Sequence, residues 1–368
     1  MATPVTAGAP RGAVASRPRQ ADVALLGIGT VGGEFLRRLA RLQRAGAPLR
    51  LVHVANSRHA LARGSGVDPS IAAGLVRAGA GAGAFVDPAA ALSGAACGIV
   101  VDASGSERVA ASHARWLDAG LHVVTASKLG QGASLARWRA IDAASRRTGA
   151  RYGDSATVGA GLPLLRSLRE LREGGDAVHG IAGVLSGSMA WLFGAFDGLR
   201  PFSGFVRQAR EAGYTEPDPR EDLSGEDVRR KLLILARAAG FALDVDDVQV
   251  ESVVPPALAG LALAQVDGAL GVLDAPLRER FAEAYKRGER LRHVARLDVR
   301  AGRVRARVGI ESLPPDDPLC AGTGTDNRVA IRCDRYPTQP LVIQGPGAGA
   351  GVTAAALLDD VLRIVRRG

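Results

Sequence analysis

The chain has 368 residues, of which 47% are hydrophobic and 23% charged, and these proportions are typical of globular proteins. The length indicates about two domains, and the composition excludes disorder of the whole chain. The sequence has no run of about 18 apolar residues free of charge, which argues against a membrane span. The three cysteines form no CxxC pair and the six histidines no HExxH motif. A disulfide scaffold, a cysteine-based zinc site and a zincin are therefore excluded.

Lysine and arginine number 47 against 37 acids, which gives a net charge of +10. Such a charge raises the question of nucleic acid, but the basic residues are scattered and aromatic residues make up only 4%. We therefore expect small anionic ligands, with neither a nucleic-acid nor a membrane partner. The low cysteine count fits a reducing compartment, and we expect the protein to be cytoplasmic.

Residues 1–20 contain three prolines, three arginines and no acid. Arginine without acid occurs in transit peptides, but the prolines would interrupt an amphipathic helix, and no apolar segment is present. The composition predicts a disordered tail.

From Ala21 onwards, short apolar runs alternate with helical patterns. In the first helical pattern, Phe35, Leu39 and Leu42 recur at helical spacing. Alternating strands and helices predict a parallel, doubly wound sheet. The strands expected in this half are Val23–Leu26, Leu51–Ala55, Gly98–Asp102 and Leu121–Thr125.

The rest of the chain, from about Gly180 onwards, does not show this regular alternation of strands and helices. We expect an extended loop over Gly213–Arg220, because Pro217 and Pro219 disfavour helix in the residues before them. Alternation over residues 293–312 predicts a hairpin that turns at Ala301 and Gly302. The other expected elements are a strand at Gly180–Leu185, a helix at 225–239, a strand at Leu341–Ile343, a glycine loop at 345–351 and a closing helix that ends at Arg367.

Gly27, Gly29 and Gly32 form a GxGxxG motif between the first strand and the first helix. The first glycine allows the tight turn, the second allows a pyrophosphate to approach the backbone, and the third allows the helix to pack on the strand. The helix N-terminus then attracts the phosphates. The motif predicts dinucleotide binding; a tight turn without a ligand is the alternative.

The second strand runs into Asn56 and Arg58 without an acid. NAD enzymes usually place a carboxylate here, and its absence leaves room for a 2′-phosphate, with which Arg58 could pair. The pattern favours NADP over NAD, unless Arg58 is only a solvated loop charge.

Two further strand ends carry polar residues, Asp102-Ala103-Ser104-Gly105 and Thr125-Ala126-Ser127-Lys128. The carboxyl ends of strands line the ligand crevice of a doubly wound fold. A lysine there can act on an oxygen of the substrate, although Lys128 taken alone is more often a surface lysine.

A dense group of charged residues lies between positions 216 and 231. Ser224 and Asp227 resemble a helix start, and Asp227 and Lys231 are four residues apart on one helical face. This pattern is compatible with a capped helix and a surface ion pair. It also suits a substrate with an ammonium group, where Lys231 exchanges a proton if burial lowers its pKa. The group comprises Glu216, Asp218, Glu221, Asp222, Asp227 and Lys231.

The stretch GYTEPDPREDLSGEDVRRK (213–231) resembles the substrate signature of the homoserine dehydrogenase family. GIGTVG, VVDASGS, VVTASK, TVGAGLPLL, GVLSGS and VIQGPGAGAGVTAAALL follow in the order of that family, so the resemblance extends from about Val23 to about Val365. It implies interconversion of aspartate 4-semialdehyde and homoserine with NAD(P)H, on the route to threonine, methionine and isoleucine, by a homodimer.

The resemblance also implies an α/β fold in which a Rossmann-like domain is joined to an α+β domain for catalysis and dimerisation. The expected boundaries are a tail at 1–20, a nucleotide-binding domain at 21–155 completed by 345–368, and a catalytic domain at 156–344. The implied site residues are Lys128 and Lys231 for catalysis, Tyr214, Glu216, Asp222 and Asp227 for the substrate, and Gly27, Gly29, Thr30, Val31, Gly32, Ser104, Lys128 and Gly349 for the cofactor.

Three departures from the family pattern matter. Ser127 stands where the family often has asparagine, and Ser155 stands where it often has a glutamate that helps to bind a monovalent cation. The carbonyls of Val158, Ala160 and Leu162 could still bind sodium, but Asp154 is one position away from the usual acid. No residues follow Gly368, so we expect no threonine control through an appended domain.

Two other classes of protein remain open. A semialdehyde dehydrogenase or similar two-domain oxidoreductase would need a catalytic cysteine, and none of Cys97, Cys320 and Cys333 has a histidine near it in sequence. A non-catalytic sensor would bind the dinucleotide without oxidising homoserine.

Overall fold

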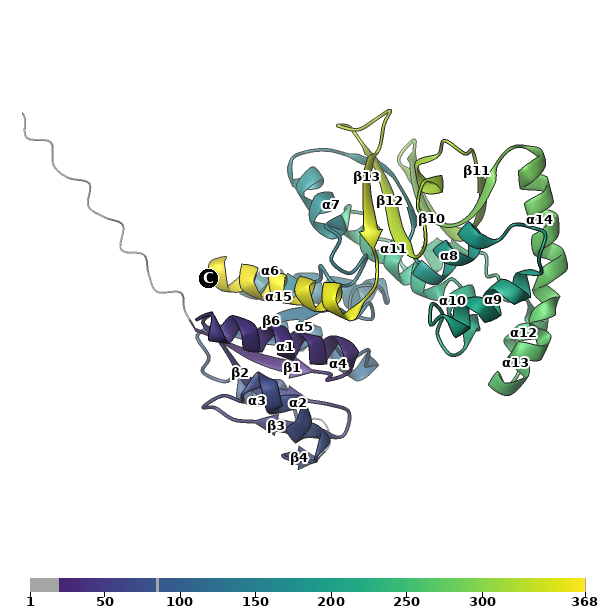
Figure 1. Cartoon of the computed structure of the whole chain (residues 1–368). Coiled ribbons are helices and arrows are strands. Elements are labelled where there is room, and N and C mark those ends of the chain that lie inside the picture. Colours follow the sequence, from purple (N-terminus) through teal and green to yellow (C-terminus); the bar gives the residue numbers. More distant parts are fainter. Residues whose placement is uncertain (1–19, 84–85, 368) are drawn as a thin grey trace, which may run out of the picture.

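The structure is a computed structural model that describes residues 20–83 and 86–367. The predicted tail at 1–20 therefore lies outside the described residues, apart from Gln20. Two sheets, each with its own helices, organise the described chain (Figure 1).

The first sheet has the strand order β4-β3-β2-β1-β5-β6-β7. Strands β2, β1, β5, β6 and β7 pair in parallel, while β3 and β4 add an antiparallel edge. The doubly wound parallel sheet predicted from the sequence is confirmed. Its strands are β1 (Ala21–Leu26), β2 (Leu49–Ala55), β3 (His59–Ala62), β4 (Ala82–Gly83), β5 (Gly98–Asp102), β6 (His122–Thr125) and β7 (Tyr152–Gly153).

Helices cover both faces of this sheet, because alternate side chains of each buried strand point to opposite sides. Along β1, Val23 and Leu25 pack with α1 and α15, whereas Ala24 and Leu26 pack with α5 and α6. The C-terminal helix α15 therefore lies beside α1, as Figure 1 shows in yellow and purple. The helices are α1 (Thr30–Arg44), α2 (Pro69–Arg77), α3 (Pro88–Ala91), α4 (Glu107–Ala111), α5 (His113–Asp118), α6 (Leu135–Thr148) and α15 (Ala350–Arg367).

The second sheet has the order β13-β12-β8-β10-β11-β9 and is antiparallel except for the pair β9 and β11. The predicted hairpin is confirmed as β10 and β11. Its turn residues, Ala301 and Gly302, have φ angles of 48° and 74°, as a type I′ turn requires. The strands are β8 (Val178–Val184), β9 (Val248–Val250), β10 (Arg290–Arg300), β11 (Arg303–Leu313), β12 (Asp326–Cys333) and β13 (Leu341–Pro346).

One face of the second sheet is covered by α7 and α11, whose leucines pack against Ile181, Leu297 and Ile331. A separate helical group with a phenylalanine-rich core lies at the end of the molecule far from the first sheet (Figure 1). The helices are α7 (Leu164–Glu173), α8 (Gly187–Ala195), α9 (Phe202–Glu211), α10 (Pro219–Leu223), α11 (Glu226–Ala238), α12 (Pro256–Ala259), α13 (Leu263–Ala269) and α14 (Asp274–Lys286), with 3-10 turns at Val245–Asp247, Leu270–Leu273 and Pro318–Cys320.

Two local predictions around the acidic stretch are wrong. The loop that begins at Gly213 does not continue to Arg220, because α10 begins at Pro219 with Asp218 as its cap. Proline is well suited to the first helical position, which has no need of its N–H. Ser224 is not at the N-cap position of α11 either: it ends α10, and Gly225 precedes α11 with a φ of 79°, although the Ser224 hydroxyl accepts from the amide of Glu226 at 3.2 Å.

Candidate active site

A cleft of about 740 Å³ lies between the carboxyl ends of β1, β5 and β6 and the start of α11. The segment after β13 closes one side. Residues from both halves of the molecule therefore meet here, as expected for the crevice of a doubly wound fold. The lining residues used below are Thr30, Val31, Ala103, Gly105, Lys128, Glu216, Asp227, Arg230, Lys231 and Gly349.

The glycine turn precedes Thr30 and Val31, which line the cleft, but Gly27, Gly29 and Gly32 are not among the lining residues. A β-carbon on Gly32 would lie 1.9 Å from the carbonyl oxygen of Gly27, so only glycine allows helix α1 to approach the turn this closely. Nothing lies within 4 Å of a β-carbon built on Gly29, and no side chain caps α1. The backbone there is open to a ligand, and the positive end of the helix dipole faces it.

The end of β2 lies beside this turn, because the amide of Gly27 donates to the carbonyl of Ala55. Asn56 uses its side-chain oxygen to accept from the amides of Arg58 and His59, each at 2.7 Å. Arg58 is exposed, and its guanidinium has no hydrogen bond or ion pair within residues 20–83 and 86–367. Neither Asn56 nor Arg58 lines the cleft itself.

The sequence analysis missed a second arginine near the turn. Arg77, at the end of α2, donates to the carbonyl of Ile28 at 3.0 Å. The two residues are 49 positions apart, and no motif connects them in the sequence. Arg77 adds positive charge beside the glycine turn.

The two candidate lysines meet at one carboxylate. Asp227 lies 2.8 Å from the Lys231 amine and 3.4 Å from the Lys128 amine. Lys231 also donates to the carbonyl of Leu185 at 2.8 Å, and its side chain is only 13% exposed. The ion pair that the spacing allowed therefore forms, but the side chain of Lys231 is largely buried while the Asp227 side chain is 45% exposed.

The electrostatics of this group follow from burial and proximity. Burial lowers the pKa of Lys231, and the positive charge of Lys128 lowers it further, against the opposing effect of Asp227. Burial acts to raise the pKa of Asp227, but the two lysines overcome it and lower that pKa to about 2. The carboxylate is thus charged at neutral pH, and Lys231 releases a proton more readily than a free lysine does.

The predicted substrate residues fall into two groups. Glu216 lines the cleft, and its carboxylate has no partner within the described residues. Asp222 accepts instead from the Ser188 hydroxyl at 2.5 Å and from the amide of Glu216 at 2.8 Å. Tyr214 packs on Trp191 with ring centroids 5.5 Å apart and is 44% exposed. Asp222 thus supports the loop that carries Glu216, and neither Asp222 nor Tyr214 lines the cleft.

Two of the predicted cofactor residues outside the glycine turn, Gly349 and Ser104, differ in whether they line the cleft. Gly349 lines the cleft, as do Ala103 and Gly105 on either side of Ser104. The Ser104 hydroxyl donates to Asp102 at 2.7 Å and is not part of the lining.

Arg230 is another residue that the sequence analysis passed over. It precedes Lys231, lines the cleft and makes no ion pair with the described residues. Its neighbour Arg229 pairs with Glu226, and the two arginines are equivalent in the sequence pattern. Only the rotation of α11 about its axis distinguishes them.

The residues considered for a monovalent cation already have other partners. Ser155 donates from its amide and its hydroxyl to Asp360, at 2.9 and 2.8 Å, and Arg363 also contacts this carboxylate. Asp154 forms an ion pair with Arg169. Within the described residues, no group of three or more His, Cys, Asp or Glu side chains is arranged to hold a metal ion. The two nearby carboxylates are thus paired with arginines, and the carbonyls of Val158, Ala160 and Leu162 remain the predicted donors for a cation.

The fold and this cleft place the chain in the class of two-domain proteins built on a Rossmann-type dinucleotide-binding sheet. The family model for the NAD-binding domain of homoserine dehydrogenase matches residues 27–153, and that for homoserine dehydrogenase matches residues 163–362. The chain belongs to the homoserine dehydrogenase family.

Two curated relatives illustrate the similarity. A homoserine dehydrogenase of Emericella nidulans is 36% identical over 93% of this chain and 98% of its own length. Bifunctional aspartokinase/homoserine dehydrogenase 2 of Escherichia coli is 36% identical over 95% of this chain. The chain spans 44% of the length of this bifunctional relative.

Solved structures show the same fold. A Candida auris protein of unknown function has a TM-score of 0.84 at 34% identity, covering 94% of this chain and 98% of its own. A hyperthermophilic archaeal homoserine dehydrogenase in complex with NADPH has a TM-score of 0.72 at 19% identity, covering 94% and 98%. No helix in residues 20–83 and 86–367 has the length and hydropathy needed to cross a bilayer.

Proposed function

We propose that this chain is an NAD(P)-dependent homoserine dehydrogenase that reduces aspartate 4-semialdehyde reversibly to homoserine. The observation that carries the proposal is the pair of lysine amines bridged by Asp227, in a cleft that Thr30 and Val31 at the start of α1 also line. Membership of the homoserine dehydrogenase family supports it. The bound nicotinamide supplies or accepts the hydride in this reaction.

The residues at the glycine turn fit a dinucleotide. The open backbone at Gly29, together with Thr30 and Val31 at the helix N-terminus, suits a pyrophosphate. The absence of a carboxylate at the end of β2 and the unpaired charge of Arg58 favour NADP over NAD, and Arg77 reinforces that preference. An archaeal structure of the same fold was solved with NADPH.

The two lysines carry out the proton transfer of the reaction and stabilise the charge that develops on the substrate oxygen. Lys231, with its lowered pKa, takes the hydroxyl proton during oxidation and returns it during reduction. Lys128 stabilises the developing alkoxide, and Asp227 keeps both amines oriented.

The substrate is an amino acid, so the site must meet an ammonium and a carboxylate. Glu216 supplies the negative charge that no lysine neutralises, with Asp227 close to it in the cleft. The unpaired guanidinium of Arg230 is the positive group available for the substrate carboxylate. Asp222 and Tyr214 act on the substrate through the loop that carries Glu216.

We further propose the domain boundaries 21–155 with 345–368 for nucleotide binding and 156–344 for catalysis, and a cytoplasmic location. Residues 345 and 346 belong to β13 of the second sheet, so the chain crosses between the domains just after Pro346. A monovalent cation held by the carbonyls of Val158, Ala160 and Leu162 stays a prediction, because Arg363 and Arg169 pair with the nearby acids rather than with these carbonyls.

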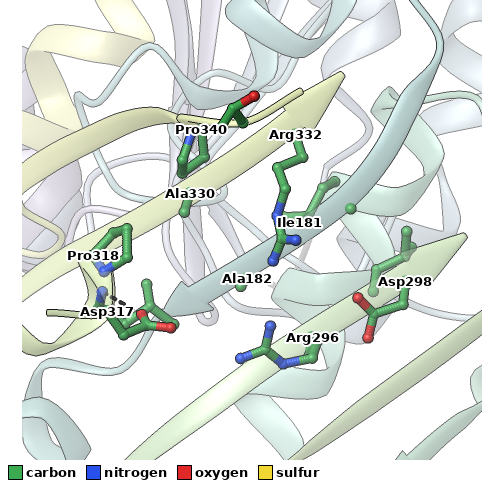
Figure 2. A pocket seen from close by; sticks show the side chains of 13 residues that line it. Ile181, Ala182, Arg296, Asp298, Asp317, Pro318, Ala330, Arg332 and Pro340 are labelled. Carbon is green, nitrogen blue, oxygen red and sulfur yellow. Dashed lines mark hydrogen bonds between the residues drawn. The ribbon is translucent and has the colours of Figure 1, made fainter. Parts of the chain in front are cut away.

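The homodimer is proposed to form through the second sheet. The face of this sheet opposite α11 has a pocket of about 160 Å³. Small residues line it together with charged side chains of β10 and β12, among them Arg296, Asp298 and Arg332 (Figure 2). Asp298 and Arg332 make no ion pair within the described part of the chain. A second copy related by a two-fold axis could pair each with the other, because such an interface is self-complementary.

The decisive experiment follows the absorbance of reduced nicotinamide, with homoserine and either NADP or NAD. We expect homoserine-dependent reduction of the nucleotide, faster with NADP. Nucleotide binding without turnover would instead indicate a sensor. Nucleotide reduction with aspartate 4-semialdehyde and phosphate, but none with homoserine, would indicate a semialdehyde dehydrogenase. That alternative would need an active thiol, yet Cys320 and Cys333 are buried, and burial raises the pKa of Cys97.

A further inference from the structure

A chain of buried hydrogen bonds lies beneath the cleft, and the proposed proton transfer does not use it. Asp102, the last residue of β5, and His113, the first of α5, are both fully buried. The Nε2 atom of His113 lies 3.1 Å from the Asp102 carboxylate, and its Nδ1 atom lies 2.9 Å from the Tyr152 hydroxyl. None of the three lines the cleft.

One direction of this chain satisfies every polar atom of the ring. Burial raises the pKa of the Tyr152 phenol well above its ordinary value, so the phenol stays protonated and can donate a hydrogen bond to Nδ1 of His113. The imidazole then carries its own proton on Nε2 and donates it to Asp102. Both polar ends of a buried ring are thereby satisfied.

The carboxylate of Asp102 is saturated with donors. Besides His113, it accepts from the amide and the hydroxyl of Ser104, at 2.9 and 2.7 Å, and from the hydroxyl of Thr125 at 3.1 Å. Burial alone would raise the pKa of Asp102, but the bonds from His113 and Ser104 hold it below its usual value. The group therefore stays ionised and holds all four donors.

These donors belong to two loops that face the cofactor cleft. Ser104 lies in the loop after β5, which contributes Ala103 and Gly105 to the lining. Thr125 ends β6, and its hydroxyl oxygen also accepts from the amide of Ser127 at 2.9 Å, the residue before Lys128. One buried carboxylate thus connects both loops.

We propose that Asp102 and His113 are positioning residues that set the separation of these two loops and hold Lys128 within reach of Asp227. This inference rests on the proposed function. The chain of contacts runs from Tyr152 through His113, Asp102 and Thr125 to Ser127, without a gap longer than 3.1 Å. Misplacing a catalytic group by about 1 Å can cost about 100-fold in rate, so a remote bond can matter.

The test compares matched threonine variants. Thr125→Val keeps the shape of the side chain but breaks the link to Ser127 and Asp102. Thr148→Val is the control, because Thr148 also accepts from an amide and donates to a carbonyl in the same half of the molecule, away from the cleft. We expect Thr125→Val to lower kcat about 10-fold or more and to shift the pH midpoint of kcat/KM, and Thr148→Val to do neither.

A second pair probes the imidazole. His113→Leu should reduce kcat and shift the same pH midpoint, and His113→Gln should recover most of the loss, because a glutamine amide can replace the Nε2 donor to Asp102. Unchanged kcat and pH midpoint in Thr125→Val, or a loss in His113→Gln as large as in His113→Leu, would overturn the proposal. If His113→Leu does not fold, the threonine pair decides alone.

The unmodified protein separates this inference from the proposed function. If it fails to oxidise homoserine, the proposed function itself is wrong. If it is active and the variants behave like their controls, only the positioning role is wrong.

Discussion

At the scale of single residues, the site is defined by which charges remain unpaired. Asp227 forms ion pairs with two lysines, and Asp222 accepts hydrogen bonds from a serine hydroxyl and a backbone amide. Of these three acids, Glu216 alone lines the cleft with a carboxylate that has no partner within the described residues. Unpaired charges in a cleft are the groups that a charged substrate can engage. These three acidic residues are close together in the sequence, but they therefore have different roles in the site.

Replacing Lys231 tests the proton transfer. We expect Lys231→Ala to lower kcat by about 100-fold or more, because general acid–base groups contribute about 10²- to 10⁴-fold. The affinity for NADPH, measured by its fluorescence, should stay the same, since the glycine turn is untouched. Lys286→Ala, an exposed lysine in α14, is the control. Loss of NADPH binding would point to a structural role for Lys231.

Replacing Arg58 tests the nucleotide preference. A charged hydrogen bond to a phosphate contributes about 1.5–3 kcal/mol, so Arg58→Ala should raise the KM for NADP by about 10- to 100-fold and leave that for NAD nearly unchanged. Arg63→Ala removes another exposed arginine close by as a control. Equal effects on both nucleotides would refute the pairing with the 2′-phosphate.

At the scale of elements, the site depends on close contacts between a turn, a helix start and a loop. Helix α1 packs directly on the carbonyl of Gly27, and α11 presents Asp227, Arg230 and Lys231 because its apolar side is buried on the second sheet. Helix packing thus fixes which side chains enter the cleft. The residues that line it come from both sheets.

A pair of neighbouring glycines tests this packing. Gly32→Ala forces a β-carbon against the carbonyl of Gly27 and should abolish NADPH binding. Gly33→Ala meets nothing within 4 Å and should leave binding intact, while stabilising α1 by about 0.5–1 kcal/mol. The measurements are fluorescence titration and thermal unfolding. Similar behaviour of the two variants would contradict the close approach.

At the scale of the whole molecule, two buried histidines make stability depend on pH. Burial lowers the pKa of His53, in the first sheet, and of His293, in the second, to about 4. The unfolded chain, where histidine has its usual pKa near 6.5, binds protons that the folded chain does not. Both sheets are thus weakened by acid.

The free energy of unfolding should therefore fall as the pH drops from about 6.5 to about 4, by up to about 3 kcal/mol for each histidine. Above pH 6.5 both states hold neutral rings, and this contribution is constant. Urea unfolding at several pH values measures the slope, and His293→Leu should make it shallower. An unchanged slope in that variant would show that His293 does not contribute to the acid sensitivity.

The proposed dimer is also a property of the whole molecule. Arg332→Asp should weaken self-association in sedimentation experiments, because two like charges then face each other across the two-fold axis. Adding Asp298→Arg in the same chain should restore it through the exchanged pair. A monomeric unmodified protein would exclude the interface.

Much of this molecule can be predicted from the sequence, because the signals are local. The alternation of strands and helices, the glycine turn after β1 and the hairpin turn at Ala301 each follow from periodicity or from backbone conformation. The meeting of Lys128 and Lys231 also followed from motifs, each attached to the end of an element. The short strands β3, β4, β7 and β9 were missed, since a few residues show no periodicity.

The sequence by itself determined the doubly wound sheet, the family resemblance and the set of charged residues from which a site could be built. Only the tertiary structure decided which charges face the cleft: Glu216 rather than Asp222, and Arg230 rather than Arg229. The physical reason is that the rotation of α11 and the course of the preceding loop depend on burying apolar side chains against strands far away in sequence. The bond between Asp102 and His113 arises in the same way, from packing α5 on the first sheet.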